Sequence, residues 1–594
     1  MMSDVEEHRH KPLGSPDLIR VLDLQPSRSP SAPIQCKLRQ VPLDGSGTTF
    51  EALSYVWGAR AGDQPIICDG QRLLVTPNCH SALVQLRRGF RKRTLWIDAI
   101  CINQRDDEVS KQERNHEVAR MGEIYRRASC VLIWLDPRNT LDPEFFRNAR
   151  YGNRFCLLTI LSLDRKPIWS TSKWEKYTAQ LLQDPWFSRV WTVQEVAFAR
   201  SAVVMSNQWK IPFHILANAI RIPNWSHGRL GNLIEFRLDA AKSFNSFSPD
   251  SLTQPPKEHI GLFRCLPYLQ CIQPHDKVYG FYAMIQKWGV ELAPPDYEKD
   301  VSRLFQEVVV AFVQHNKSLE PLTTTLPASL ATGLASWTPN WLTAQTTIGD
   351  DGVDMNGVFD VGFFRNGQLA SSSSKATVKW DPGHGSIELR SKRIGDIMTL
   401  SSCIPEEPRE PEQVKEFISE CRNWCQANRE EITSYTPFSI SDLFAPSSFC
   451  LITDSSVWFH TMLYQNLNEA AAAILSPGLQ PPQYLQQLAK DFKAVTSPEV
   501  IKSELQEISN RTQSLVNDTA HYAFFALDTG HLGRAHHSCQ LGDGIWLLAG
   551  CDWPLVLRRQ GDSFRIVAPA YIVGIMEGEL WPEDEDTLET ITLV

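Results

Sequence analysis

Glu195 and Trp191 are, by residue type and spacing, the pair in this chain best suited to carry chemistry. Residues four apart on a helix are neighbours, so the indole should lie beside the carboxyl group. Burial against an indole raises the pKa of a carboxyl group. A carboxylate held there could bind ribose hydroxyls or stabilise the oxocarbenium-like charge of a breaking glycosidic bond. The alternative is a structural ion pair with Arg189 or Arg200.

A second set of polar and aromatic residues follows two apolar runs. Asp98 lies inside the run Thr94–Ile102, and an unpaired buried acid costs several kcal/mol, roughly. It is therefore either bonded to backbone amides or an Arg, or it supports a ligand at the carboxyl end of a sheet, where open α/β sheets bind ligands. Asn103 and Gln104 could contact a nucleotide or only form a turn. Trp57 ends an earlier apolar run and could stack on a nucleotide ring or pack in the core.

Other catalytic and metal-binding patterns are missing or incomplete. The sequence has no His-Glu-x-x-His, Gly-x-Ser-x-Gly or Gly-x-Gly-x-x-Gly motif. Cys101 stands between two isoleucines, so a packed thiol is favoured over a nucleophile paired with His80 or His116. The histidines and cysteine of residues 531–539 fit no zinc spacing, and no metal site is expected.

The segments that must position these residues alternate between strand and helix patterns. Apolar runs predict strands at Phe50–Trp57, Thr94–Ile102, Cys130–Leu135 and Ser201–Met205. Helices are predicted after Thr76 with Pro77 in first position, from a capping box at Ser110 and Glu113, and from Asp184 to about Ala199. This alternation, with strands that are apolar throughout, predicts an α/β fold with a parallel sheet covered by helices on both faces.

The composition excludes several classes of function. The net charge of −9 over 594 residues is spread thinly, without the basic stripe that binding to nucleic acid requires. The 14 cysteines form no disulfide framework, which fits a reducing compartment. The first residues are polar and the longest apolar runs are short, which argues against a signal peptide and a membrane span. We therefore expect a cytoplasmic protein that binds no nucleic acid and has no membrane span.

Three motifs in the first two hundred residues resemble the HET (heterokaryon incompatibility) domain of filamentous fungi. They are Glu51–Gly58, Leu95–Gln104 and Trp186–Glu195, with shorter matches at Ile67–Asn78 followed by His80 and Leu83, at Glu113–Tyr125 and at Val131–Leu135. Features common after the HET domain follow at His275–Gly280, Pro295–Tyr297, Trp337–Trp341 and between Gly542 and Glu579. The chain departs from the pattern at His116, where Gln is frequent, and in residues 530–539, a loose version of a Gly-rich stretch.

The resemblance implies a TIR- or flavodoxin-like fold and a role in fungal non-self recognition that leads to programmed cell death. Some TIR proteins cleave NAD with a Glu four residues after a Trp, the relation of Trp191 to Glu195. Glu195 is therefore the catalytic candidate and Asp98 its support. Trp57, Asn103, Gln104 and Trp191 are the candidate nucleotide contacts. NAD would be a substrate, and no cofactor is required. The rival hypotheses are a non-catalytic adaptor that self-associates or recruits proteins, and a cytosolic enzyme of another kind.

The expected organisation has five parts. They are a disordered lead at 1–17, the HET domain at 18–206, a helical extension packed on it at 207–345, a variable and mostly helical region at 346–520, and a small β module at 521–594.

Overall fold

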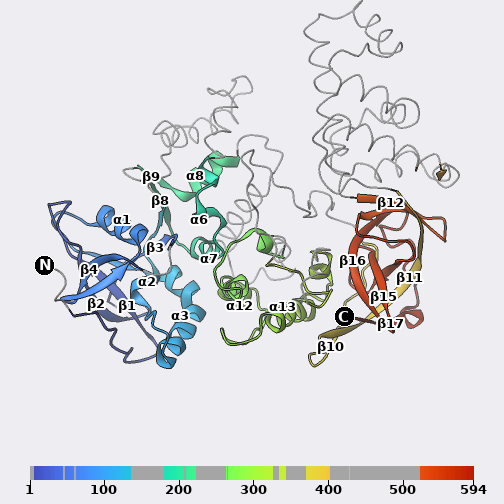
Figure 1. Ribbon diagram of the computed structural model, residues 1–594, viewed down its shortest axis with the longest axis horizontal. Coiled ribbons are helices and arrows are strands. Elements are labelled where there is room, and N and C mark those ends of the chain that lie inside the picture. The colour runs from blue at the N-terminus through green and yellow to red at the C-terminus, as the bar shows by residue number, and fades with distance from the viewer. Residues whose placement is uncertain are drawn as a thin grey trace, which may run out of the picture. The chain divides into compact units, whose positions relative to one another are not determined.

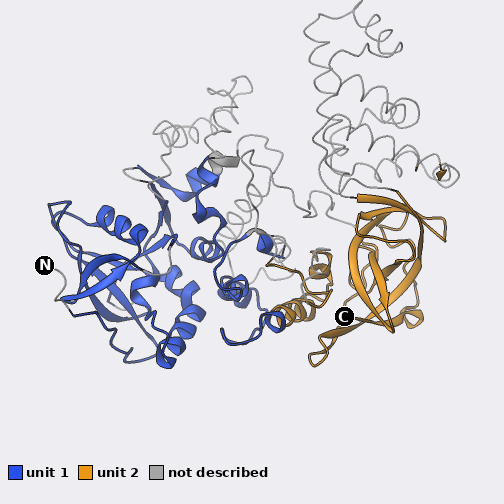
Figure 2. Ribbon diagram, in the orientation of Figure 1, with its two compact units in different colours: residues 1–304, 348–353 blue, residues 305–347, 354–594 orange. Residues whose placement is uncertain are grey.

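A computed structural model describes residues 6–44, 47–58, 62–135, 180–206, 209–221, 262–263, 265–324, 334–342, 369–401, 424, 427–428 and 522–594. The chain divides into two compact units, residues 1–304 with 348–353 and residues 305–347 with 354–594 (Figures 1 and 2). The variable and mostly helical region expected at 346–520 falls largely outside the described residues.

The first unit is built on a nine-stranded sheet with the order β5-β4-β2-β1-β6-β3-β7-β8-β9. Its strands are β1 (Leu18–Leu24), β2 (Gln35–Pro42), β3 (Glu51–Tyr55), β4 (Gln64–Cys68), β5 (Gln71–Val75), β6 (Arg93–Trp96), β7 (Val131–Trp134), β8 (Ala202–Ser206) and β9 (Trp209–Pro212). β6, β3, β7 and β8 are parallel, whereas β1 beside β6 and β9 beside β8 are antiparallel. The predicted parallel sheet is thus confirmed at its centre and wrong at its flanks, where hairpins reverse the chain.

The four parallel strands bring their carboxyl ends to one edge of the sheet. Their order along the chain is β3, β6, β7 and β8. In the sheet, however, β6 lies beside β3 on one side, and β7 lies beside β3 on the other. α1 (Pro77–Leu86) precedes β6, and α3 (Glu108–Arg127) precedes β7. Thr76 caps α1 as predicted, because its hydroxyl accepts a hydrogen bond from the Cys79 amide. The strand order therefore reverses between β3 and β7, which is where open α/β sheets leave a crevice.

Two predicted elements are shorter than expected for a local reason. The strand expected at Thr94–Ile102 ends at Trp96, and α2 (Asp98–Cys101) follows. The Asp98 carboxylate accepts a hydrogen bond from the Ala99 amide at 2.7 Å, and such a local bond competes with a strand ladder. The helix expected from Asp184 is broken into α6 (Pro185–Ser188) and α7 (Trp191–Ala197). The break is at Arg189, whose backbone is extended.

The start of α3 also differs from the prediction. Asp107, rather than Ser110, is its N-cap residue, and its carboxylate accepts hydrogen bonds from the Ser110 amide at 3.0 Å and the Ser110 hydroxyl at 2.7 Å. The predicted capping box of Ser110 and Glu113 is therefore wrong. Glu113 pairs instead with the buried Arg20 guanidinium at 2.6 Å.

The beginning of the chain is ordered from residue 6, contrary to the disordered lead expected at 1–17. Glu7 forms a parallel bridge with Arg72 of β5. The His8 amide donates to the Arg72 carbonyl at 2.8 Å, and the Arg72 amide donates to the Glu6 carbonyl at 2.8 Å. These bonds satisfy the backbone groups of Arg72 at the outer edge of β5, which an exposed edge strand would leave unpaired.

Helices continue the first unit after the sheet. They are α8 (Phe213–Arg221), the 3₁₀ turn η2 (Leu266–Tyr268), α11 (Asp276–Tyr279) and α12 (Tyr282–Lys287). α13 (Val301–Asn316) begins in the first unit and belongs to the second from residue 305 onward. α3 packs against both α12 and α7. The α3 backbone approaches closely at Gly122, where a Cβ atom would lie 2.9 Å from the Phe198 ring and would also strike Ala283.

The second unit is a β structure that closes on itself. Its strands are β10 (Lys379–Asp381), β11 (Ser386–Leu400), β12 (Tyr522–Leu527), β13 (Leu532–His536), β14 (Gly544–Leu548), β15 (Leu555–Gln560), β16 (Ser563–Ile572) and β17 (Glu589–Leu593). β11 pairs with both β12 and β14, which joins the two ends of the path β11-β12-β13-β16-β15-β14. The β module expected at 521–594 therefore omitted β11, the longest strand of this unit. Buried and accessible side chains alternate over much of β11, residues 386–400.

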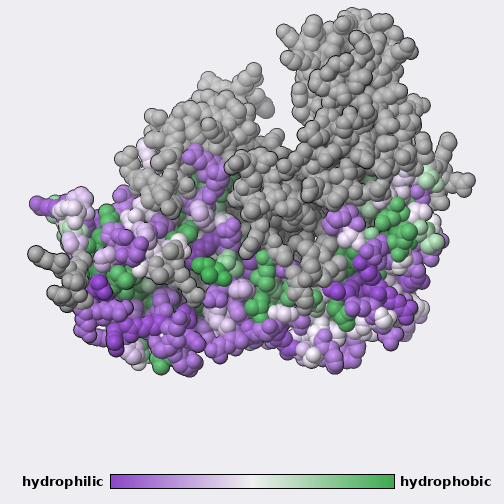
Figure 3. All heavy atoms as spheres, viewed as in Figure 1, coloured by the Kyte–Doolittle hydropathy of each residue, from purple (hydrophilic) through white to green (hydrophobic). Residues whose placement is uncertain are grey.

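No helix among the described residues is long and apolar enough to cross a membrane. On the face seen in Figure 3, hydrophilic side chains cover most of the described surface and apolar residues form only small areas.

The contact at Gly122 generates a stability prediction. Gly122→Ala should lower the free energy of unfolding by about 1–3 kcal/mol, because the added methyl group overpacks α3 against α12 and α7, although alanine favours an isolated helix. Urea unfolding measures the change. Gly89→Ala is the control, since the nearest atom to its added Cβ is 4.0 Å away. A Gly122→Ala protein as stable as the wild type would contradict this packing.

Candidate functional site

A cleft of about 670 Å³ lies at the carboxyl edge of the parallel strands in the first unit. Trp57 enters it just after β3, and Asp98 enters it two residues after β6. Arg189 and Trp191, from the break between α6 and α7, line another part of the wall. The cleft thus gathers side chains from segments that are far apart in the sequence, as the parallel topology requires.

Asp98 is the acid at the floor of this cleft. Its Oδ2 accepts a hydrogen bond from the Trp57 indole nitrogen at 2.8 Å, and its Oδ1 accepts one from the Ala99 amide. Burial raises the pKa of Asp98, although the Arg189 cation and these two hydrogen bonds act to lower it. Asp98 is thus bonded to a backbone amide and also lines the cleft at the carboxyl edge of the parallel strands.

Arg189 supplies positive charge beside this acid. The extended backbone between α6 and α7 directs its side chain toward β3, where its guanidinium donates to the Tyr55 carbonyl at 2.6 Å. The same guanidinium lies 5.6 Å from the centre of the Trp57 ring, a cation–π distance. Its charge lowers the pKa of Asp98, Glu195 and Asp276. Arg189 is therefore the electrostatic centre of the site.

Trp191 joins the cleft to a second acid. Its indole is hydrogen-bonded to Asp276, which also accepts a hydrogen bond from the Tyr297 hydroxyl at 2.7 Å. Burial raises the pKa of Asp276, although the hydrogen bonds from Tyr297 and Trp191 and the charge of Arg189 act to lower it. Asp276 and Tyr297 both line the cleft, so two buried acids border the space around one guanidinium.

Glu195 lies outside the cleft. It is 2% exposed, and its carboxylate accepts a hydrogen bond from the Ser54 hydroxyl of β3. A hydrogen bond to Tyr125 adds a second partner. Burial raises the pKa of Glu195 to about 7, while Arg189 acts to lower it. Glu195 therefore anchors α7 to β3 from within the core, whereas Trp191, one turn earlier, faces the cleft.

Asn103 and Gln104 line the cleft, and their amide groups also support the loop. The Asn103 side chain donates to the Ser110 hydroxyl at 2.8 Å and accepts a weak bond from the Arg105 amide at 3.3 Å. The Gln104 side chain donates to the Asp98 carbonyl at 3.2 Å. These residues thus form the turn and also border the cleft.

Of the six predicted site residues, five line the cleft, and Glu195 lies behind it. From the sequence, Arg189 was expected only as a partner for Glu195, and no role was expected for Asp276 or Tyr297. Asp276 and Tyr297 belong to two stretches that resemble features common after HET domains, His275–Gly280 and Pro295–Tyr297. The presence of both stretches in one chain was the sequence signal that could have identified them. The N-terminal residues His8 and His10, which also line the cleft, carried no signal of this kind.

The arrangement favours a ligand with a flat ring and hydroxyl groups. Two indoles offer stacking surfaces, buried carboxylates accept hydrogen bonds from hydroxyls, and a guanidinium binds anionic groups. The volume lies within the range of about 300–1,000 Å³ typical of small-molecule sites.

The buried Glu195 should make stability depend on pH. Its folded pKa of about 7 lies above the ordinary value of 4.5, so the stability it contributes is full below pH 4.5 and is lost as pH rises through 7. The loss is roughly 3 kcal/mol by pH 8. Glu195→Gln removes this ionisation. The difference between the free energies of unfolding of the wild type and of Glu195→Gln should therefore fall by roughly 3 kcal/mol between pH 4.5 and pH 8.

Urea unfolding at several pH values tests this expectation. Glu108→Gln, which replaces an exposed acid at the start of α3, is the control, and its difference from the wild type should stay constant. A constant difference for Glu195→Gln as well would show that Glu195 does not titrate in a buried state.

Comparison with known proteins agrees with the motifs. The family model described as "Heterokaryon incompatibility protein (HET)" matches residues 50–195. The chain is also 26% identical over 226 residues to "Heterokaryon incompatibility protein 6, OR allele" of Neurospora crassa, an alignment that covers 31% of this chain and 32% of that protein. The match therefore spans about a third of that relative's length. No solved structure is significantly similar to the chain. Residues 50–195, which carry three of the four parallel strands and most of the residues that line the cleft, are a heterokaryon incompatibility (HET) domain.

Proposed function

We propose that this protein acts in fungal heterokaryon incompatibility, as an effector that promotes programmed cell death through its HET domain. The HET match at residues 50–195 and the name of the Neurospora crassa relative support this role. All nine cysteines that the described residues contain are free, which supports a site of action in the reducing cytoplasm.

The strand order supports a distant kinship with TIR and flavodoxin-like domains. The parallel strands lie in the order second, first, third, fourth, which matches the first four positions of the flavodoxin-like order 2-1-3-4-5. In that fold the ligand binds at the reversal beside the first strand. Here the residue two places after β3, Trp57, lines the cleft.

A nicotinamide dinucleotide is the ligand we propose for this cleft. The observation that carries the proposal is the convergence of Trp57, Trp191, Asp98 and Arg189 on one space of about 670 Å³. An indole can stack on the nicotinamide or adenine ring, Arg189 can bind the pyrophosphate, and Asp98 can accept hydrogen bonds from ribose hydroxyls.

Cleavage of the bond between nicotinamide and ribose is the reaction we propose for this site. The bonding electrons leave with the nicotinamide nitrogen, positive charge develops on the ribose, and water then adds and releases a proton. A carboxylate near the ribose stabilises that charge. Among the acids that line the cleft, Asp98 is bonded to the Trp57 indole, which lies beside Arg189, so we assign it the contact with ribose. Glu195, the catalytic candidate from the sequence, is assigned a positioning role through Ser54.

A non-catalytic adaptor is the second candidate function. The observation in its favour is that Glu195 is held in the core by Ser54 and Tyr125, away from the cleft. In this case the HET domain would act by self-association or by recruiting protein partners, and the cleft would bind a ligand without cleaving it.

The catalytic proposal predicts release of nicotinamide from NAD by the purified full-length protein at high concentration. Asp98→Asn should lower the rate by at least about 100-fold, as does loss of a group that stabilises charge in the transition state. Glu195→Gln should lower it less than 10-fold, because its side chain lies outside the cleft. Asp562→Asn, in an exposed turn of the second unit, is the control. Equal rates for the wild type and Asp98→Asn would rule out this chemistry.

Expression in a filamentous fungus tests the cellular role. The wild type should stop growth, and the double variant Trp57→Ala with Trp191→Ala should not, because it removes both stacking surfaces of the cleft. Immunoblots establish that both proteins accumulate. Arrest by both would favour the adaptor, and normal growth with the wild-type protein would contradict the proposed role.

A further inference from the structure

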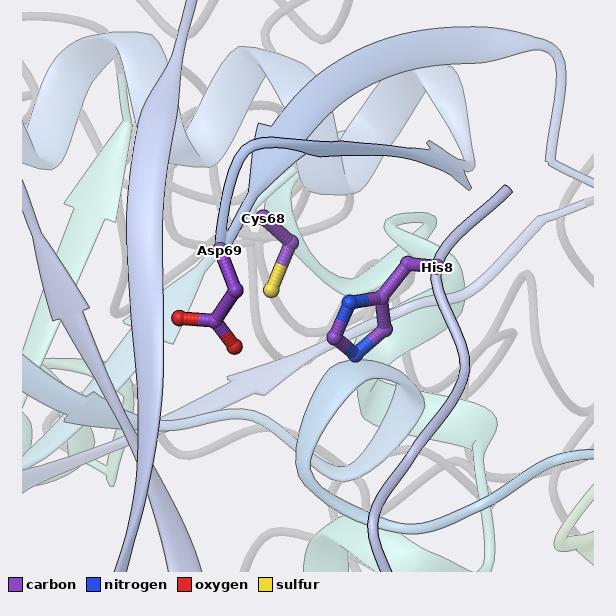
Figure 4. Close-up of side chains that lie close together, drawn as sticks. All are labelled: His8, Cys68 and Asp69. Atoms are coloured by element: carbon purple, nitrogen blue, oxygen red, sulfur yellow. The ribbon is translucent and has the colours of Figure 1, made fainter. Parts of the chain in front are cut away.

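Three side chains with metal-binding atoms lie close together beside the β4–β5 hairpin, at the β5 edge of the nine-stranded sheet. They are His8, Cys68 and Asp69. One ligand atom from each lies within 4.8 Å of the other two. Figure 4 shows the His8 ring, the Cys68 sulfur and the Asp69 carboxylate directed toward a common space. At Zn–N and Zn–S bond lengths of about 2.0 and 2.3 Å, tetrahedral ligand atoms lie about 3.5 Å apart. Small side-chain rotations would therefore bring these atoms to zinc-binding distances.

The fold holds each member of this cluster by a separate constraint. Cys68 is the last residue of β4, and Asp69 is the first residue of the turn to β5. Asp69 has a φ of 52° and Gly70 a φ of 83°, as a two-residue hairpin turn requires. His8 is brought to the hairpin by its backbone hydrogen bond to Arg72.

His8 is the observation that indicates a ligand. It is 6% exposed, and neither ring nitrogen makes a hydrogen bond of normal geometry with a described residue, although the Cys68 backbone lies close enough to act on the pKa of the imidazole. A buried polar group without a partner costs about 1–3 kcal/mol, so an imidazole directed at a thiol and a carboxylate calls for an explanation. A metal ion would satisfy one ring nitrogen.

The surrounding residues favour zinc over a hard cation. A Cys–His–Asp set combines a soft sulfur, an imidazole nitrogen and one oxygen, which suits Zn²⁺ and not Mg²⁺ or Ca²⁺. The neighbouring Cys36, opposite Cys68 in the β2–β4 ladder, is hydrogen-bonded to the Cys68 thiol. A second sulfur thus lies beside the cluster.

We infer that His8, Cys68 and Asp69 form a zinc site that fastens the N-terminal segment to the β4–β5 hairpin. The sequence could not reveal this site, because His8 is 60 positions from Cys68 and no paired ligand motif marks either residue. Glu7, His8 and His10 line the cleft, so a metal here would fix one of its walls. The inference rests on these side chains and not on the reaction proposed above.

Metal titration of the purified, metal-stripped full-length protein tests the site. Co²⁺ should bind with a thiolate-to-cobalt charge-transfer band in the near ultraviolet, and one equivalent of Zn²⁺ should abolish that band. Cys68→Ser should remove the band. Asp69→Asn and His8→Gln should each weaken Zn²⁺ binding at least 10-fold. Asparagine tolerates the positive φ at position 69, so Asp69→Asn keeps the turn while removing the carboxylate.

Matched variants control for effects on folding and for the other thiols. Cys79→Ser replaces an equally buried cysteine outside the cluster, and His10→Gln replaces the neighbouring histidine, whose Nε2 bonds the Ile100 carbonyl at 2.8 Å. Both should keep the cobalt band and the Zn²⁺ affinity of the wild type. A band that persists in Cys68→Ser, or Zn²⁺ binding that Asp69→Asn leaves unchanged, would overturn the site. So would a wild-type protein that takes up no Zn²⁺ at micromolar concentration.

Discussion

The hydroxyl of Ser54 is the point on which the arrangement of the first unit depends. It accepts a hydrogen bond from the Trp186 indole at 2.8 Å and donates one to the Glu195 carboxylate. One buried atom of β3 thereby holds both α6 and α7. Each group is almost fully buried, and unpaired polar groups in such a place are costly. The position of Arg189, between the two helices, follows from this constraint.

Charge at the cleft is organised around that arginine. Burial raises the pKa of Asp98, Glu195 and Asp276, and in each case Arg189 acts in the opposite direction. Three acids that share one cation cannot all ionise without cost. A bound anion that engages the guanidinium would withdraw part of this stabilisation and raise the pKa values of the acids further. Ligand binding and protonation at this site are therefore linked.

The sequence predicted the parts of the fold that depend on local pattern. The parallel centre of the sheet, the cap at Thr76 and the helix start at Asp184 follow from apolar runs and capping residues. The errors arose where a local bond or a distant partner decides the structure. Asp98 ends a strand early through its own side chain, and β11 depends on strands far along the chain. Within the site, spacing placed Trp191 beside Glu195 but could not tell which of them faces the cleft, because the helix is buried all round.

The pairing of β11 has a consequence for synthesis of the protein. Leu389 in this strand lies opposite Ile591 near the C-terminus, so the ring of strands includes contacts of very high sequence separation. Such contact order slows folding, and until β17 is made residues 387–391 of β11 lack a strand on one side. An incompletely translated chain would therefore expose a long unpaired strand, which favours aggregation or degradation. For a protein proposed to kill the cell that makes it, this topology would tie a folded second unit to synthesis of β17.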